Sequence, residues 1–123
     1  MSDNLRVGIT SDSVQILRDG ESVAGFTAGL ALIVGTTILK HVNADDPQAV
    51  AEIEAALHLQ DKDGQLAEEF ARHKFSVQLC SDGDIMCWLD ARIIFTAGAD
   101  DAKQLAGEII TAATVILQAQ NNY

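Results

Sequence analysis

The strongest constraint on the fold of this chain is an alternation of apolar and polar residues on both sides of a short turn, residues 81–83. Side chains alternate between the two faces of a β-strand, so each arm predicts a strand with one buried face. Only one register keeps both apolar sets on the same face, because a shift of one residue would set Phe75 opposite Asp90. Gly83 suits the last position of a three-residue loop with a G1 bulge. The predicted hairpin covers residues 74–96, and its inward pairs are Phe75 with Leu89, Val77 with Cys87 and Leu79 with Ile85.

The two cysteines of the chain lie on opposite faces of this predicted hairpin. Cys87 belongs to the inward set, whereas Cys80 points outward beside Asp84. Side chains on opposite faces cannot form a disulfide or share a metal ion without backbone movement. Cys87 is therefore interpreted as a small core residue. Cys80 is not interpreted as a catalytic nucleophile, because the neighbouring carboxylate disfavours its thiolate.

The same register places a polar strip around one large aromatic side chain on the outward face of the hairpin. Lys74 is expected across from Asp90, and Ser76 across from Trp88. Trp, Met and Arg are enriched where proteins bind one another, so this face is the predicted protein-binding site. Its predicted residues are Lys74, Gln78, Met86, Trp88, Asp90 and Arg92. The alternative is that a second helical layer covers the sheet and buries the indole as ordinary core.

The N-terminal third of the chain predicts further strands and a buried segment. Alternation in residues 5–9 and 14–16 predicts an N-terminal hairpin, and residues 18–21 read as a turn. Residues 22–42 are apolar on all sides, which fits a buried helix or two buried strands.

Helix signals occupy the middle and the end of the chain. Asp46-Pro47 predicts a helix start, with an Asp cap and proline in the first turn. A second short helix is expected through Phe70, and acids in residues 98–101 predict the start of a long C-terminal helix. Together these elements predict one α+β domain over residues 1–123, in which a mostly antiparallel sheet packs against helices.

The chain carries a formal net charge of −10, from 18 acidic residues against 8 Lys and Arg. Such a surface repels phosphate backbones, so nucleic acid is excluded as a predicted partner. The acidity is concentrated in residues 45–69, which are interpreted either as a solvated helical face or as a surface that steers a basic protein. The predicted steering residues are Asp45, Asp46, Glu52, Glu54, Asp61, Asp63, Glu68 and Glu69.

Residues 22–39 carry no charge and reach the lower length limit of a membrane span. Many of them are Ser, Thr or Gly, and the flanking Glu21 and Lys40 give no basic cluster to fix an orientation. The stretch is therefore interpreted as buried in the protein. The N-terminal residues do not match a secretory signal, so a cytoplasmic location is expected. No repeat of about 20 to 50 residues is apparent.

The sequence contains no coherent catalytic or metal-binding set. His41, His58 and His73 each lie near the end of a predicted helix, and no pair has the spacing of a helix-borne zinc site. Residues 59–70 fail as a calcium loop, because the first and last positions are apolar. The glycines match no nucleotide-binding motif. No catalytic residue, metal or cofactor is predicted.

These observations favour a small, non-enzymatic binding or regulatory module of the adaptor, inhibitor or immunity type. It is expected to form a homodimer and to bind another protein through the outer face of residues 74–92. The alternative is a small enzyme or ligand-binding domain with a pocket between residues 22–42 and the sheet, lined by Thr36, Thr37 and His41.

Overall fold

The computed structural model describes residues 5–60 and 64–121 and shows an α+β fold with two three-stranded antiparallel sheets. The first unit consists of β1 (Leu5–Ile9), β2 (Ser13–Arg18), β3 (Glu21–Thr27) and α1 (Ala28–Val42). The second unit consists of β4 (Phe75–Leu79), β5 (Asp84–Leu89), β6 (Arg92–Gly98) and α4 (Ala99–Asn121). Between them lie α2 (Pro47–Gln60) and α3 (Gln65–Ala71).

The two units share one arrangement in detail. β2 and β5 have six residues each, and β3 and β6 have seven each. Both middle strands carry a β-bulge at the same position, after Ile16 and after Cys87. In both units the middle strand ends in a turn whose two residues have positive φ, Asp19-Gly20 and Asp90-Ala91. The chain therefore contains two copies of a βββα unit, which are joined by α2 and α3.

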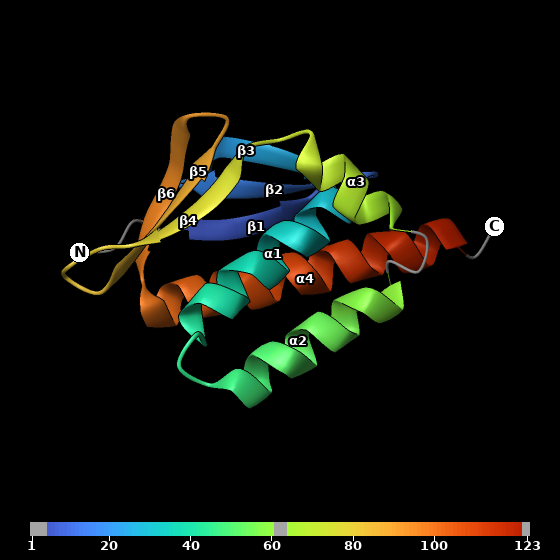
Figure 1. Cartoon of the computed structure of the whole chain (residues 1–123). Coiled ribbons are helices and arrows are strands. Elements are labelled where there is room, and N and C mark those ends of the chain that lie inside the picture. Colours follow the sequence, from blue (N-terminus) through green and yellow to red (C-terminus); the bar gives the residue numbers. More distant parts are fainter. Residues whose placement is uncertain (1–4, 61–63, 122–123) are drawn as a thin grey trace.

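The sheets and helices form layers. Figure 1 shows both sheets on one side of α1 and α4, with α2 on the other side of these helices. Buried residues of both sheets and both helices join one hydrophobic core, which includes Ile16, Ile38, Phe95 and Ile109. α2 packs on α1 with half-buried residues only, so it adds little to this core.

The most extensive contact between elements joins α1 and α4. At their crossing, Gly35 lies against Ala106, and these two residues occupy the same position in their helices. A Cβ atom on Gly35 would lie 3.0 Å from the carbonyl oxygen of Ala106 and 2.7 Å from Cγ1 of Ile110. Only glycine permits this approach without a shift of its neighbours. Contact between equivalent positions is what an approximate two-fold axis between the units requires.

Two arginines join the sheets where β3 meets β6. Arg18 donates a hydrogen bond from Nη2 to the carbonyl oxygen of Ile94 at 3.1 Å, and Arg92 donates one to that of Val23 at 3.4 Å. Val23 and Ile94 hold the same position in β3 and β6. Each sheet thus supplies a guanidinium group that satisfies a backbone acceptor on the neighbouring sheet.

Several helix predictions are confirmed. α2 begins at Pro47, where the side chain of Asp46 accepts a hydrogen bond from the backbone N–H of Ala49 at 3.2 Å. α4 carries Asp100 and Asp101 in its first turn. The long C-terminal helix and the mostly antiparallel sheets match the predicted α+β class.

The buried helix expected for residues 22–42 is confirmed only over Ala28–Val42, and the alternative of two strands is wrong. Residues 21–27 form a strand, in which Ala24 and Phe26 are buried, and the helix starts only at Ala28. The hydroxyl group of Thr27 accepts the Leu30 N–H at 3.4 Å and so caps the helix at the boundary. The charge-free stretch is therefore divided between β3 and α1. Within residues 5–60 and 64–121, no helix is long and apolar enough to cross a membrane.

The second predicted hairpin is also incomplete. The expected strand continues only to Leu89, because Asp90 and Ala91 turn the chain with φ values of 50° and 70°, and residues 92–98 return as a third strand. This places Arg92 on β6, beyond the turn. Glycine is the usual sequence signal for such a turn, and the Asp90-Ala91 turn contains none.

The close approach of α1 and α4 generates a test with a matched control. Gly35→Ala is expected to lower the free energy of unfolding by about 1 to 2 kcal/mol, because overpacking outweighs the gain in helix propensity. Gly107→Ala, in α4, is expected to raise it by up to about 1 kcal/mol, because its added Cβ would have no atom within 4 Å. Urea unfolding of both variants provides the measurement. Equal stabilisation by both substitutions would contradict the tight crossing.

Candidate protein-binding surface

The predicted register of the β4–β5 hairpin is confirmed. Phe75 pairs with Leu89, Val77 with Cys87 and Leu79 with Ile85. The loop closes through hydrogen bonds from the Cys80 N–H to the Asp84 carbonyl and from the Gly83 N–H to the Cys80 carbonyl, at 2.8 and 3.0 Å. Gly83 has a φ of 91°, as its place at the end of the loop requires.

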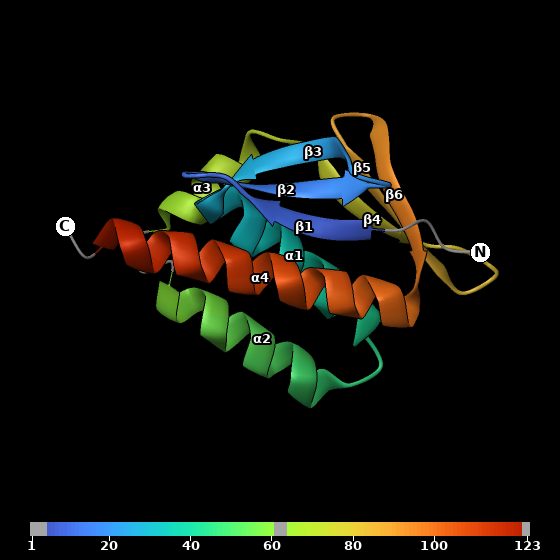
Figure 2. The ribbon, with the colours of Figure 1, turned by 180° about the vertical axis from the view of Figure 1, so that it is seen from behind.

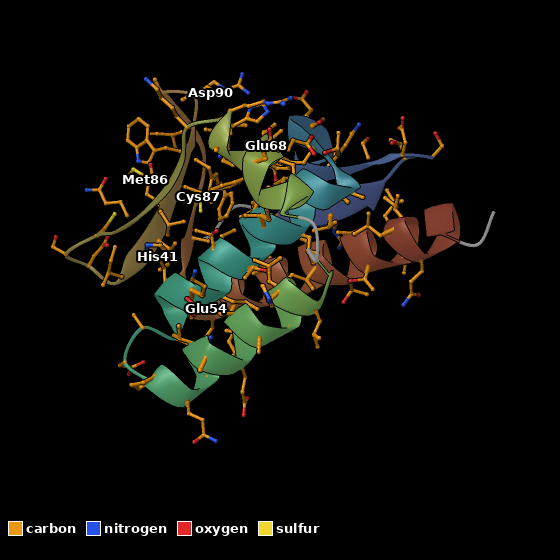
Figure 3. The ribbon with its side chains drawn as sticks, turned by 45° about the vertical axis from the view of Figure 1, so that its right-hand side comes forward. His41, Glu54, Glu68, Met86, Cys87 and Asp90 are labelled. Carbon is orange, nitrogen blue, oxygen red and sulfur yellow. The ribbon has the colours of Figure 1, made fainter. Side chains whose placement is uncertain are left out.

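The cysteines lie as the alternation predicts. Both are free thiols; Cys87 is fully buried and Cys80 is half-buried. Figure 3 shows Cys87 on the helix-facing side of the hairpin and Met86 on the outward side. Burial raises the pKa of the Cys87 thiol to about 12, so this group stays neutral and inert near pH 7.

The outward face of the hairpin holds a groove around Trp88, which we call the Trp88 groove. Trp88 is half-buried and pairs across the strands with Ser76. The groove has a volume of about 470 Å³ and lies on the outward side of β4, the edge strand of its sheet. It is lined by Lys74, Phe75, Ser76, Gln78, Trp88 and Ala91.

Three of the six predicted binding residues line this groove, namely Lys74, Gln78 and Trp88. Met86 is half-buried and pairs with Gln78, so it lies on the same face beyond the groove. Asp90 and Arg92 lie at the turn end of the strands and do not line it.

The base of the groove is fixed by the backbone around Asp90. The Asp90 carboxylate accepts a hydrogen bond from the Lys74 N–H at 3.0 Å, and the Asp90 N–H donates to the Lys74 carbonyl at 2.8 Å. His73 places Nδ1 3.5 Å from the same carboxylate. The hydrogen bond from Lys74 and the nearby His73 hold the pKa of Asp90 below its usual value. Asp90 therefore positions the start of β4.

Three groove residues, Phe75, Ser76 and Ala91, are not among the predicted site residues, although Ser76 is expected on the same face across from Trp88. Phe75 packs against the core, as its alternation predicts, and its ring lies edge-to-face with that of Phe70 at 5.9 Å between centroids; the residue also borders the groove. Ala91 was expected to continue a strand, whereas it lies in the turn. Recognition of the Asp90-Ala91 turn would have placed Ala91 outside the strands.

The acidic residues lie on other elements. Figure 3 shows Glu54 on α2 and Glu68 on α3, away from Met86 on the hairpin. Glu54 pairs with Lys40 at 3.2 Å, and Glu68 lies 3.9 Å from Arg72. Glu69 accepts a hydrogen bond from the Thr27 hydroxyl at 2.9 Å. Those that are exposed are Asp45, Asp46, Glu52, Glu54 and Glu68, whereas Asp61 and Asp63 fall outside the described residues.

The described residues hold no group of three or more His, Cys, Asp or Glu side chains that could bind a metal ion. Thr36 lines a cavity of about 150 Å³, but this cavity lies between α1, α2 and α4, not between helix and sheet. The hydroxyl groups of Thr36 and Thr37 donate to carbonyls of their own helix, and His41 is exposed.

Comparisons of the chain with protein-family models, with curated proteins and with solved structures find no match.

The Asp90-Ala91 turn beside the groove gives a stability prediction. An alanine at φ of 70° is strained, and glycine stands at the same position of the first unit, Gly20. Ala91→Gly is expected to raise the free energy of unfolding by about 0.5 to 1 kcal/mol, and Gly20→Ala to lower it by about 1 kcal/mol. The midpoints of urea unfolding curves measure both changes, provided that the denaturant dependence of the free energy of unfolding is the same in all proteins. A loss of stability in Ala91→Gly would be inconsistent with a strained turn.

Proposed function

We propose that this chain is a non-enzymatic protein-binding module of the adaptor, inhibitor or immunity type, which binds its partner through the Trp88 groove. The groove combines an aromatic residue, Trp88, with the polar residues Lys74, Ser76 and Gln78. Interfaces use this combination, because aromatic anchors supply most of the binding energy while rim groups set orientation.

The half-buried state of Trp88 is the observation that carries this proposal. Leu17, at the same position of the first unit, packs beside Gly8 with Cδ1 3.3 Å from where a Cβ would be. The second unit has Gln78 and Trp88 at these positions and a groove between them and the turn. The indole of Trp88 thus lies on the solvent side of its sheet, while the other face of this sheet packs against the hydrophobic core.

The charge distribution favours a basic partner. The exposed carboxylates on the α1–α2 loop, α2 and α3 lie apart from the groove, so their expected role is long-range attraction and not contact. Homodimer formation and a cytoplasmic location belong to the same proposal. The two unpaired thiols are compatible with a reducing compartment.

An enzyme or small-ligand domain with a pocket at Thr36 is the less favoured function. The cavity there is small and apolar, and the only hydroxyl group in its lining already donates to a carbonyl in its own helix. No specific observation supports catalysis at that position.

The groove is tested by affinity purification from the source cells with the full chain as bait. Trp88→Ala is expected to weaken partner capture by about tenfold or more, because a central aromatic anchor contributes about 2 kcal/mol or more. Leu17→Ala is the matched control, since it truncates the equivalent outward residue of the first unit. A partner retained equally by all three proteins would overturn the proposal.

The steering role is tested separately with the purified partner. Replacement of Glu52, Glu54 and Glu68 by glutamine is expected to slow association and to flatten its dependence on salt, with little effect on dissociation. An unchanged association rate would remove the acidic surface from the proposal while leaving the groove in place.

A further inference from the structure

A second groove lies between the edge strand β1 and helix α4, on the far side of the molecule from the Trp88 groove. It has a volume of about 580 Å³, and we call it the β1–α4 groove. Figure 2 shows β1 and α4 side by side along its length, and Figures 1 and 2 show them running in the same direction. Its lining consists of Arg6, Val7 and Ile9 from β1 with Gln104, Gly107, Glu108, Thr111, Ala112 and Val115 from α4.

One wall of this groove is an open strand edge. β1 pairs with β2 on one side, and no strand in the described part of the chain pairs with its other side. The strand contains no proline, and its outer N–H and C=O groups are available to an added strand. Another strand satisfies these groups in a regular ladder, whereas a docked helix has its own backbone groups already paired.

The other wall leaves room for that strand. Gly107 lines the groove next to Glu108, and a Cβ there would have no atom within 4 Å. Ile9 is 55% exposed and Val115 is 53% exposed, so the groove offers two apolar side chains to a bound segment. Because β1 and α4 run in the same direction, these two side chains lie toward one end of the groove, and Arg6 and Glu108 toward the other.

Arg6 repeats a device that the protein uses inside its own fold. Arg18 and Arg92 hold the facing sheet edges by donating to the carbonyls of Ile94 and Val23. Arg6 lies on edge strand β1, next to the middle strand β2 that carries Arg18, and it makes no hydrogen bond or ion pair with any described residue. A guanidinium on an edge strand can donate to a backbone carbonyl of a strand added beside it.

We propose that the β1–α4 groove binds an extended peptide segment of a partner protein, which adds to β1 as a further strand. The segment has an apolar side chain over Ile9 and Val115, because both are exposed there. At the other end it carries a basic side chain, because the Glu108 carboxylate has no partner among the described residues. This site is independent of the Trp88 groove, which lies on the other sheet.

The test uses short random peptides displayed on phage and selected on the full-length chain. The most enriched peptide is then synthesised, and its binding is followed by titration and by NMR of the chain. The expected result is that the amides of β1 and of α4 around Gly107 shift and that β1 amides become protected from exchange. Enriched peptides are expected to alternate apolar residues and to carry Lys or Arg.

Matched variants identify the site. Ile9→Arg and Gly107→Leu are each expected to lower the affinity of the chain for the peptide by about tenfold or more. Leu79→Arg should leave its affinity unchanged, since Leu79 is 69% exposed at the same end position of edge strand β4. Trp88→Ala should also leave it unchanged. Circular dichroism confirms that each variant is folded.

Four results would overturn the proposal. They are failure to enrich any peptide, equal losses in Ile9→Arg and Leu79→Arg, peptide shifts confined to the Trp88 groove, and a dimer of the chain that Gly107→Leu dissociates. The last result would assign the groove to a second copy of the chain instead of a peptide.

Discussion

The close approach of α1 and α4 at Gly35 and Ala106 is the contact on which the rest of the fold depends. Neither three-stranded sheet is covered by its own helix alone: α4 also packs on β1 and β2, and α1 also packs on β4. Each unit therefore completes the core of the other, as subunits do across a two-fold axis. A Cβ atom at Gly35 would lie too close to Ile110 and to the Ala106 carbonyl oxygen, so the two helices could not keep this approach without a shift.

This arrangement also decides which surfaces remain open. β3 and β6 meet near the axis, where Arg18 and Arg92 satisfy the facing carbonyls, so the outer edges of the two sheets are β1 and β4. Both proposed binding surfaces lie beside these outer edges. Sequence differences between the units give them different chemistry: an indole with polar neighbours beside β4, and an arginine with exposed aliphatic residues beside β1. One repeated scaffold thus presents two distinct surfaces.

The alternation of residues 75–89 was sufficient to predict the register of the β4–β5 hairpin and the faces of Cys80 and Cys87, because burial of one face permits a single phase. The two third strands were not predictable in the same way. β3 lies within a stretch that is apolar throughout, and β6 follows a turn that lacks glycine. The repeat is not visible in the sequence, because equivalent positions share their burial but not their amino-acid type. Ile16 and Cys87, for example, are both fully buried at the same position of β2 and β5. Phe75 packs against the core as the alternation predicts, but periodicity does not indicate which strand forms an edge, so the groove that this residue borders was not predictable.

Native-state hydrogen exchange is the most direct measurement of whether the α1–α4 crossing joins the two units into one core. The amides of Ile16 in β2 and Cys87 in β5 are buried at equivalent positions, far from each other in sequence. If each unit completes the other, both amides exchange only through global unfolding, with the same free energy and the same denaturant dependence. Exchange of one unit at a clearly lower free energy, while the other stays protected, would contradict a shared core.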